Sequence, residues 1–549
     1  MAFRRYINSF SFSNFLRSDD YRLGIETRYY CFNCGGVIVM PRYLATVSYD
    51  GNRYFGFQKQ NDQITIQGTI EEVISKVLNT NTTIYASGRT DAKVHANGQT
   101  FHFDSSKKID LGKFRYSLNC LLPSDIHIID LKEVDEEFHA RYSSLAKVYT
   151  YIVNQGEDSP FLTNYAYHLG QKLDISKMKA ASRFITGKHC FRNFTSKEED
   201  QDNFVRMIHF IDFEEKGDLL YITFAGNGFM RYMIRMLVGS LIAIGLNKEE
   251  VSYFDDNLYT EQRLITSYMA PAHGLYLKKV YYDEPLDISY HTHTYRCGHA
   301  RGKDEEYVLA SINKGLKVLG FSDHIFYPNF TGDNYPGVRG DYSLLDDYCA
   351  SVLDLKEKYK KQIEIHLGFE AEYYEDYDWY YKELLETKKV EYLILGQHFI
   401  RENGITGAFL FNSQDSIGIK KYAYALVKGM ETGYFSYVCH PDLYLSGYAE
   451  FDKTAEGIAH LIAQKSVELD IPLELNLGGF RRNFKGYGTG ECRYEYPNFD
   501  FWKIVASYGC KVLIGIDAHE PKNITESKYF LARMYIDHLK LNVLKDYRL

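Results

Sequence analysis

The stretch YHTHTYRCGHARG, from Tyr290 to Gly302, carries three histidines within nine residues. His291 and His293 are two positions apart, so on an extended strand both side chains point to the same face and can share one metal ion. Two core histidines that meet by accident would have the same spacing. The residues that follow the neighbouring apolar runs decide between these two interpretations.

From about residue 284 onward, apolar runs that predict buried strands alternate with helical stretches, which favours a parallel α/β architecture. Several of these runs end in an imidazole or a carboxylate, and barrel enzymes collect their active sites at such strand ends. Imidazoles and carboxylates outnumber thiols among these residues, which predicts zinc, iron or manganese. The residues in these positions are Asp323, His324, Glu370, His398, His440, Asp517 and His519.

The motifs HTHTYRCGHARG, GFSDH, GFEAEYY, LILGQHF, CHPD and IGIDAHEP resemble those of the polymerase and histidinol-phosphatase (PHP) family. The resemblance covers about residues 286–549 and implies an α/β fold, a distorted (β/α)7 barrel around two or three divalent metals. It also implies that Asp323 orients a histidine ligand. The implied ligand sets are His291, His293, Glu370 and Asp517 for one metal, Glu370, His398 and His440 for a second, and His299, His324 and His519 for a third.

Within that family, RCGHARG and GVRGDYSLLDDY look most like histidinol-phosphate phosphatase. The resemblance therefore implies hydrolysis of a phosphate monoester, with histidinol phosphate as the expected small-molecule substrate and other phosphoesters as alternatives. Arg339 in PGVRGDY resembles an arginine that grips phosphate, and Arg481 or Arg482 in GGFRRNF would assist it. The alternatives are that these are surface arginines and that this half is a metal-stabilised interaction module.

The preceding half contains a second informative stretch, SGRTDAKVHANGQTFHF, from Ser87 to Phe103. Gly88 allows an unusual backbone turn, and Arg89 and Asp91 flank Thr90 within it. A carboxylate held beside an arginine stays ionised and oriented, which suits a nucleophile or a base. On its own, however, the pattern is more often a capped turn with a surface ion pair.

Around this turn, YLATVSYDGNRYFGFQKQ, SLNCLLPSDI, FHARYSSLAKVYTY, GKHCFRNFT, GNGFMRYMIRMLVG and HGLYLKKVYY follow in the order seen in the tRNA pseudouridine synthase A family. The half that resembles this family spans about residues 42–283. The resemblance implies an α+β fold, an antiparallel sheet with helices, that isomerises uridine in the tRNA anticodon stem-loop without a cofactor. It maps Asp91 to the essential aspartate, Tyr149 to a base-stacking tyrosine, Arg235 to the arginine that pairs with the aspartate, and Arg89 to a residue that helps extrude the base.

The partners implied for this half are tRNA and a second copy of the chain, in a homodimer through the synthase domain. The net charge of -8 means that tRNA has to be bound by a local basic patch. The family usually has glycine where this chain has Lys93, and a left-handed turn there would be strained; Cys190 stands where an aspartate is common. The alternative is therefore a tRNA-binding module without catalysis. Candidate phosphate contacts are Arg53, Lys59, Arg141, Arg231 and Arg235.

The expected organisation is an extension at residues 1–39, a synthase domain at 40–283 and a PHP domain at 284–549. The extension is either disordered or a mis-called start with Met40 as the true N-terminus, which the intact mass of the natively expressed protein would decide. Cys31 and Cys34 form one CxxC with no second pair at zinc spacing. Scattered cysteines, no apolar run of membrane-spanning length and no signal peptide predict a cytoplasmic protein without membrane contact.

Overall fold

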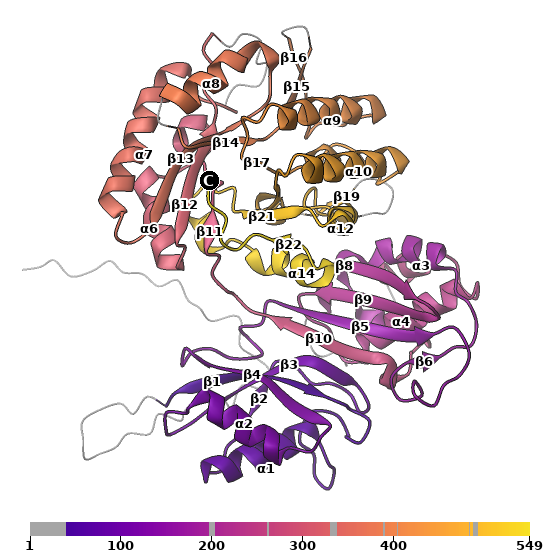
Figure 1. The fold of residues 1–549 in the computed structure, drawn as a ribbon. Helices are drawn as coiled ribbons and strands as arrows, with labels where there is room; N and C mark the ends of the chain where they lie inside the picture. Colours follow the sequence, from indigo (N-terminus) through magenta and orange to yellow (C-terminus); the bar gives the residue numbers. More distant parts are fainter. Residues whose placement is uncertain are drawn as a thin grey trace, which may run out of the picture.

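The described part of the chain forms two large sheets, one from strands between residues 42 and 281 and the other from strands between residues 288 and 543 (Figure 1). The expectations about residues 1–39, including the cysteine pair, lie outside the described residues. The computed structural model describes residues 40–196, 204–260, 263–329, 338–387, 390–402, 405–482, 484–486 and 492–549.

The first sheet has ten strands in the order β4-β1-β3-β10-β5-β9-β8-β7, with β2 beside β3 and β6 beside β5. The predicted antiparallel pairing is found except in two places, because β10 is parallel to β3 and β6 is parallel to β5. The strands are β1 (Arg42–Tyr49), β2 (Tyr85–Ala86), β3 (His95–Asp104), β4 (Ile126–Val134), β5 (Ala146–Asn154), β6 (Tyr167–His168), β7 (Gly187–Cys190), β8 (Val205–Lys216), β9 (Leu219–Gly226) and β10 (Leu275–Tyr281).

Helices lie against this sheet in two groups, α1 and α2 near β1 to β4, and α3 and α4 near β5 to β9 (Figure 1), while α5 contacts α3. The Thr65 side chain accepts a hydrogen bond from the amide of Gly68 and so caps the start of α1. The buried residues Ile66, Ile70 and Ile74 recur every four positions, which places them on one face of the helix. These helices are α1 (Ile66–Leu78), α2 (Leu111–Leu121), α3 (Ile175–Ser182), α4 (Met233–Gly245) and α5 (Tyr253–Leu258).

The second sheet is a parallel barrel, in the order β11-β12-β13-β14-β17-β18-β21-β22. A parallel bridge between Thr292 and Ala518 joins the chain after β11 to the chain after β21, which closes seven strands into the predicted distorted (β/α)7 barrel. The predicted HTHT strand is shorter than expected, because β11 ends at Ser289 and both histidines follow it. The strands are β11 (Ile288–Ser289), β12 (Val318–His324), β13 (Glu364–Ala371), β14 (Tyr392–Leu395), β17 (Tyr437–Val438), β18 (Leu473–Asn476), β21 (Lys511–Gly515) and β22 (Asn542–Val543).

Helices surround the barrel, and two short hairpins, β15 (Phe399–Glu402) with β16 (Ile405–Phe409) and β19 (Lys485–Gly486) with β20 (Cys492–Arg493), project from it. Among the described residues, no helix combines the length and the hydropathy needed to cross a bilayer. The helices are α6 (Asp304–Lys314), α7 (Leu345–Tyr359), α8 (Asp378–Thr387), α9 (Ser416–Glu431), α10 (Lys453–Glu468), α11 (Gly478–Arg481), α12 (Phe499–Tyr508), α13 (Lys522–Thr525) and α14 (Tyr529–Leu539).

The two halves share one apolar interface, where α12 and α14 lie beside β8 and β5 of the first sheet (Figure 1). The Phe210 ring of β8 stacks on Phe499 of α12, with 4.4 Å between the ring centroids. Asp212, two residues further along β8, accepts hydrogen bonds from Lys503 Nζ at 2.6 Å and from His538 Nε2 at 2.8 Å. An aromatic contact and charged hydrogen bonds therefore fix this face of the sheet against the barrel.

Strand β5 takes part in both hydrophobic cores, because successive side chains of a strand point to opposite faces. Ala146 and Val148 pack into the core of the barrel half, whereas Tyr149 and Tyr151 pack into the core of the first half. The same strand that carries the expected base-stacking tyrosine is thus supported from behind by the barrel.

Candidate functional sites

The loop that carries Asp91 lies between β2 and β3 and is held by hydrogen bonds to its backbone. Gln99 Nε2 donates to the carbonyl of Gly88 at 2.9 Å, and the amide of Phe57 donates to the carbonyl of Thr90 at 3.1 Å. Lys147 Nζ donates to the carbonyl of Ser87 at 2.6 Å. Contacts from three different segments therefore fix the position of the aspartate.

Two glycines allow the segment YDGNRYFG to approach this loop closely. A Cβ atom at Gly51 would lie 2.1 Å from the carbonyl oxygen of Val94, and one at Gly56 would lie 2.9 Å from that of Thr90. Gly56 also has a φ of +90°, which side chains with a Cβ rarely adopt. Lys93 in the loop has a φ of 66°. This is the left-handed conformation that we expected to be strained by a lysine in place of the family's usual glycine.

Asp91, on the loop between β2 and β3, and Arg235, on α4, form an ion pair. Arg235 Nη1 lies 3.3 Å from Asp91 Oδ2, and Arg235 Nε donates to the carbonyl of Ala270 at 2.8 Å. The Asp91 side chain is 27% exposed and the Arg235 side chain is 12% exposed. Burial raises the pKa of Asp91, and the charges of Arg235 and Arg231 oppose that rise. The pair is an oriented carboxylate that still reaches solvent.

Tyr149 projects from β5 toward the same region, and its ring meets Phe229 edge-on at 5.5 Å between centroids. Burial raises the pKa of the Tyr149 hydroxyl, and the nearby Tyr49 and Asp91 raise it further. Arg89 is exposed on the loop. The structure thus brings Asp91, Arg235 and Tyr149 together and leaves Arg89 at the surface.

Lys147 is a residue that the sequence analysis did not single out. Burial lowers its pKa to about 8, and its ammonium group holds the start of the aspartate loop through Ser87. The signal for it was present, because Lys147 and Tyr149 are two positions apart on one strand and so share a face.

The other expected cations of this half lie at or near the surface. Arg53 pairs with Asp125 at 3.2 Å and Lys59 with Glu71 at 3.2 Å, and both cations are exposed. Arg141 lies over its neighbour's ring, Tyr142, and Arg231 lies over that of Tyr232. Cys190 is exposed at the end of β7.

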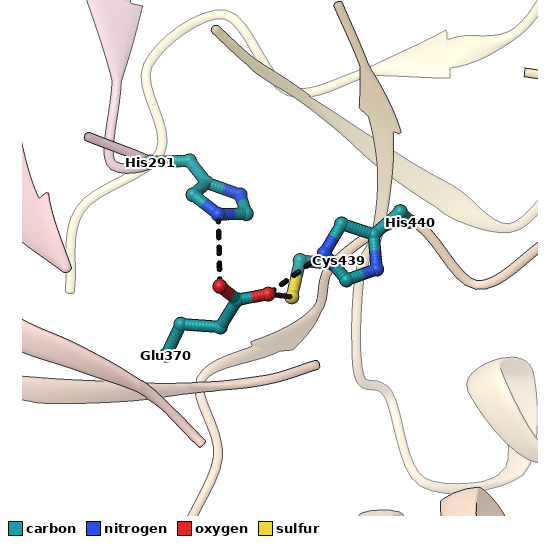
Figure 2. A group of neighbouring side chains, drawn as sticks. All are labelled: His291, Glu370, Cys439 and His440. Carbon is teal, nitrogen blue, oxygen red and sulfur yellow. Dashed lines mark hydrogen bonds and ion pairs between the residues drawn. The ribbon is translucent and has the colours of Figure 1, made fainter. Parts of the chain in front are cut away.

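The barrel site is centred on Glu370, which is the penultimate residue of β13 and is only 1% exposed (Figure 2). Imidazoles approach both of its carboxylate oxygens. Burial alone would raise the pKa of Glu370, but these imidazoles hold it well below its usual range. The distances from Glu370 are 2.7 Å to His440 Nε2, 3.1 Å to His324 Nδ1, 3.4 Å to His293 Nε2, 3.5 Å to His291 Nε2 and 3.6 Å to His398 Nε2.

Asp517 forms a second acidic centre beside the first. Its Oδ1 lies 3.3 Å from His293 Nε2, 3.7 Å from His291 Nε2 and 3.2 Å from His519 Nδ1. The ring of His299 completes this side, 4.6 Å from that of His519. All nine expected ligands therefore gather in one cluster, although they are distant in the sequence.

The donor set fits a centre of several divalent metals. Donor atoms of His291, Glu370, Cys439 and His440 lie within 4.8 Å of one another, and the same holds for His291, His293 and Asp517, and for His293, His324 and His519. Carboxylates and imidazoles in this ratio suit zinc, iron or manganese. Asp517 and His440 have φ values of 54° and 32°, an uncommon backbone conformation that clusters at functional sites.

Three residues that the sequence analysis missed support the ligands. Both Glu474 oxygens accept a hydrogen bond from His291 Nδ1, at 2.9 and 3.0 Å, and Glu372 Oε1 lies 3.4 Å from His398 Nδ1. The Cys439 thiol donates to Glu370 Oε1 at 3.2 Å (Figure 2). The signal for Glu474 was its charge inside the apolar strand LELN, which only a polar partner in the barrel explains.

Asp323 occupies the place expected of a residue that orients a histidine. It is buried, its Oδ1 lies 3.6 Å from His293 Nδ1, and it accepts hydrogen bonds from Thr294 and from the amide of His324.

The three expected phosphate-binding arginines differ in what they contact. The side chain of Arg339 is only 7% exposed and donates two hydrogen bonds of 3.0 Å to Glu372. Arg481 donates to the carbonyls of Ile516 and Asp517, at 2.8 and 2.6 Å, and so fixes the backbone of an expected ligand. Arg482 is 49% exposed, and its guanidinium lies 4.2 Å from the centroid of Phe411. Of the three, Arg482 is the one with an exposed side chain.

Comparison with known proteins places both halves. The family model for tRNA pseudouridine synthase matches residues 45–143 and 180–283, and that for the PHP domain matches residues 289–474. The tRNA pseudouridine synthase A of Geobacillus sp. (strain WCH70) is 41% identical over 244 residues, which cover 44% of this chain and 98% of that protein. The enzyme of the same name from Listeria monocytogenes serotype 4b is 41% identical over 248 residues, 44% of this chain and 100% of that protein.

Among solved structures, a histidinol phosphate phosphatase from Lactococcus lactis, crystallised with zinc, L-histidinol and phosphate, is similar with a TM-score of 0.37 and 17% identity. The match covers 47% of this chain and 95% of that protein. The chain belongs to the tRNA pseudouridine synthase A family through its N-terminal half and carries a PHP domain, which the family model matches over residues 289–474.

Proposed function

We propose that this protein is a bifunctional enzyme, a tRNA uridine isomerase joined to a metal-dependent phosphatase. In the first reaction, a uridine of the tRNA anticodon stem-loop becomes pseudouridine; in the second, a phosphate monoester, histidinol phosphate, is hydrolysed. The observation that carries the first is the Asp91–Arg235 pair beside Tyr149. The observation that carries the second is the single cluster formed by nine imidazole and carboxylate ligands.

In the isomerisation, the bond between the ribose and N1 of uracil breaks and a bond to C5 forms. Asp91 assists either by attacking the sugar or by removing its 2′ proton, and the Arg235 guanidinium keeps the carboxylate ionised and oriented. The target base has to leave its stack to reach Asp91, and we assign Tyr149 to stack on it and Arg89 to help displace it. Release of tritium from tRNA labelled at uridine C5 tests this activity.

In the hydrolysis, the three ligand sets named from the sequence would hold the metals, with Glu370 shared between two of them. Bound divalent metals supply Lewis-acid stabilisation of the phosphoryl oxygens and make water acidic enough to attack near neutral pH. Asp323, Glu372 and Glu474 orient the imidazoles, and Arg481 holds the backbone of Asp517. Arg482, whose side chain is exposed, is our choice for contact with the substrate phosphate. Phosphate release from histidinol phosphate, compared with a panel of other phosphoesters, tests the substrate.

We further propose that the protein works in the cytoplasm, where tRNA is found, and that it forms a homodimer through the synthase domain. Because α12 and α14 cover one face of the first sheet, a second copy would have to contact another surface of that domain. Light scattering of the purified full chain gives the mass in solution and tests this proposal.

A second candidate function for the first half is tRNA binding without catalysis. The strained backbone of Lys93 and the exposed Cys190, in place of the residues usual in the family, favour it. Wild-type protein that binds tRNA but releases no tritium would establish this alternative.

A further inference from the structure

Two of the expected histidine ligands have a buried glutamate behind them, and the two glutamates differ in how many partners share their charge. Glu474 lies behind His291, and Glu372 lies behind His398. A carboxylate that accepts the outer N–H of a ligating imidazole fixes the ring and makes the other nitrogen a stronger ligand. The two pairs are therefore expected to act on the metals to different extents.

Glu474 directs its charge to His291 alone. Both of its oxygens lie 2.9 to 3.0 Å from His291 Nδ1, which leaves Nε2 to face the cluster. Asn476 Nδ2 donates to Glu474 Oε1 at 2.6 Å and so holds the carboxylate in this orientation. In the part of the chain that the structure describes, His291 is the one charged partner within ion-pair distance of Glu474.

Gly515 leaves space inside the barrel for the Glu474 carboxylate. A Cβ atom at Gly515 of the neighbouring strand β21 would lie 2.2 Å from the Glu474 carboxyl carbon and from one of its oxygens. Glycine at position 515 thus allows a charged side chain to be packed inside the barrel directly behind a ligand.

Glu372 is divided between two partners. Arg339 donates two parallel hydrogen bonds of 3.0 Å to it, the strong bidentate arrangement of arginine with a carboxylate. The distance to His398 Nδ1 is longer, 3.4 Å, and Nδ1 of both His398 and His440 is buried without a hydrogen-bond partner among the described residues.

We infer that Glu474 is a positioning residue that makes the metal of the His291 set the most tightly held of the centre, whereas the metal of the His398 and His440 set exchanges more readily. This inference rests on the proposed metal-dependent function and deepens it. The His291 set also contains Asp517 besides the shared Glu370, so its formal negative charge points in the same direction.

The test measures metal retention in the full chain and does not depend on catalysis. Protein loaded with zinc is equilibrated with rising concentrations of a zinc chelator. The zinc that remains per chain is measured by inductively coupled plasma mass spectrometry. We expect stepwise loss in the wild type. In Glu474→Gln, the last step should shift to about 10-fold to 100-fold weaker binding, while the earlier steps stay where they are.

Three further variants identify the steps. His291→Ala should remove the same last step that Glu474→Gln weakens, and His398→Ala should remove an earlier one. The matched control is Glu391→Gln, because Glu391 pairs with His366 at 2.7 Å near the other end of β13 from Glu370 and should leave every step unchanged. Glutamine at position 474 keeps the size and one acceptor oxygen, and circular dichroism of the metal-free protein checks the fold.

The possible failures are distinguishable. If wild-type protein binds no zinc, the proposed metal function fails and this inference with it. If the wild type binds zinc and Glu474→Gln retains it with the same affinities, or weakens every step equally while folded, this inference alone is overturned.

Discussion

The two sites of this chain balance charge in opposite ways. In the first half, one carboxylate, Asp91, meets one arginine at 3.3 Å and stays 27% exposed. In the barrel, Glu370 is 1% exposed and surrounded by imidazoles. Burying a carboxylate this deeply costs free energy unless its charge is paired or coordinates a metal. A single oriented carboxylate thus keeps solvent access, whereas a cluster whose donor set fits several metals is packed like a core.

The largest expected effect is that of removing the metals, which should separate the two sites completely. A strong chelator should reduce phosphate release to background and leave tritium release from tRNA unchanged, because the metal ligand sets named above all lie in the barrel. The barrel should also lose stability, about 4 kcal/mol if metal was present at a thousand times its dissociation constant. Parallel activity assays and a thermal scan measure this, and re-addition of zinc is the control. Equal loss of both activities would contradict the comparison.

The reciprocal experiment is Asp91→Asn. We expect tritium release to fall by at least about a thousand-fold, because the carboxylate that assists the reaction is gone. Phosphate release should stay at the wild-type level. Filter binding of tRNA is the control, since the amide keeps the shape of the site. Substantial remaining tritium release would remove Asp91 from the proposed role.

A substitution at the interface tests whether the two halves, whose sites differ in chemistry, unfold together. Phe210→Ala should lower the free energy of unfolding by about 3 kcal/mol, because a buried ring between Phe499 and Tyr535 is lost. Since the ring is carried by β8 of the first half and packs in the core of the barrel half, denaturant unfolding should shift for both. Tyr116→Ala, at a side chain 73% exposed on α2, is the matched control and should change little. A shift in one half only would mean that the halves unfold independently.

The smallest expected effect concerns Lys147, which holds the aspartate loop without touching the ion pair. Lys147→Met should slow tritium release by about 10-fold, because the loop loses one of its anchors while Asp91 remains. Lys113→Met, at an exposed lysine of α2, is the control. An unchanged rate would show that the remaining hydrogen bonds fix the loop alone.

The burial of Lys147 should also make the free energy of unfolding depend on pH. Burial lowers the pKa of Lys147 to about 8 in the folded chain, against about 10.4 when unfolded. Between these values the unfolded state binds the proton and the folded state does not, so the stability of the wild type relative to Lys147→Met should rise from about pH 8 to about pH 10.4. Denaturant unfolding at several pH values measures it, and a flat difference would contradict the burial of this group.

The sequence predicted what depends on local pattern. Apolar runs that end in imidazoles or carboxylates, alternating with helical stretches, predicted the parallel barrel that the structure has. The parallel pairing of β10 with β3 was not predictable, because strand direction depends on a connection of many residues and leaves no local trace.

The candidate sites were predictable to the extent that their residues carry unusual chemistry at strand ends. Glu474 and Glu372 were missed because one buried acid in a strand does not reveal which histidine it faces. The engagement of Arg339 with Glu372 was missed for the same reason, since a long side chain has many possible partners. Partnership between distant side chains is decided by packing, and packing is not written in any short stretch.

The shared interface has a consequence for inheritance. Phe210, Val148 and Ala225 lie in the interior only while the barrel covers them. If the gene were split into two, these residues would form an exposed apolar patch on the separate synthase. The separate synthase would then tend to aggregate until polar substitutions arose there. The two enzymes, whatever their metabolic relation, are therefore constrained to evolve, be translated and be degraded as one molecule.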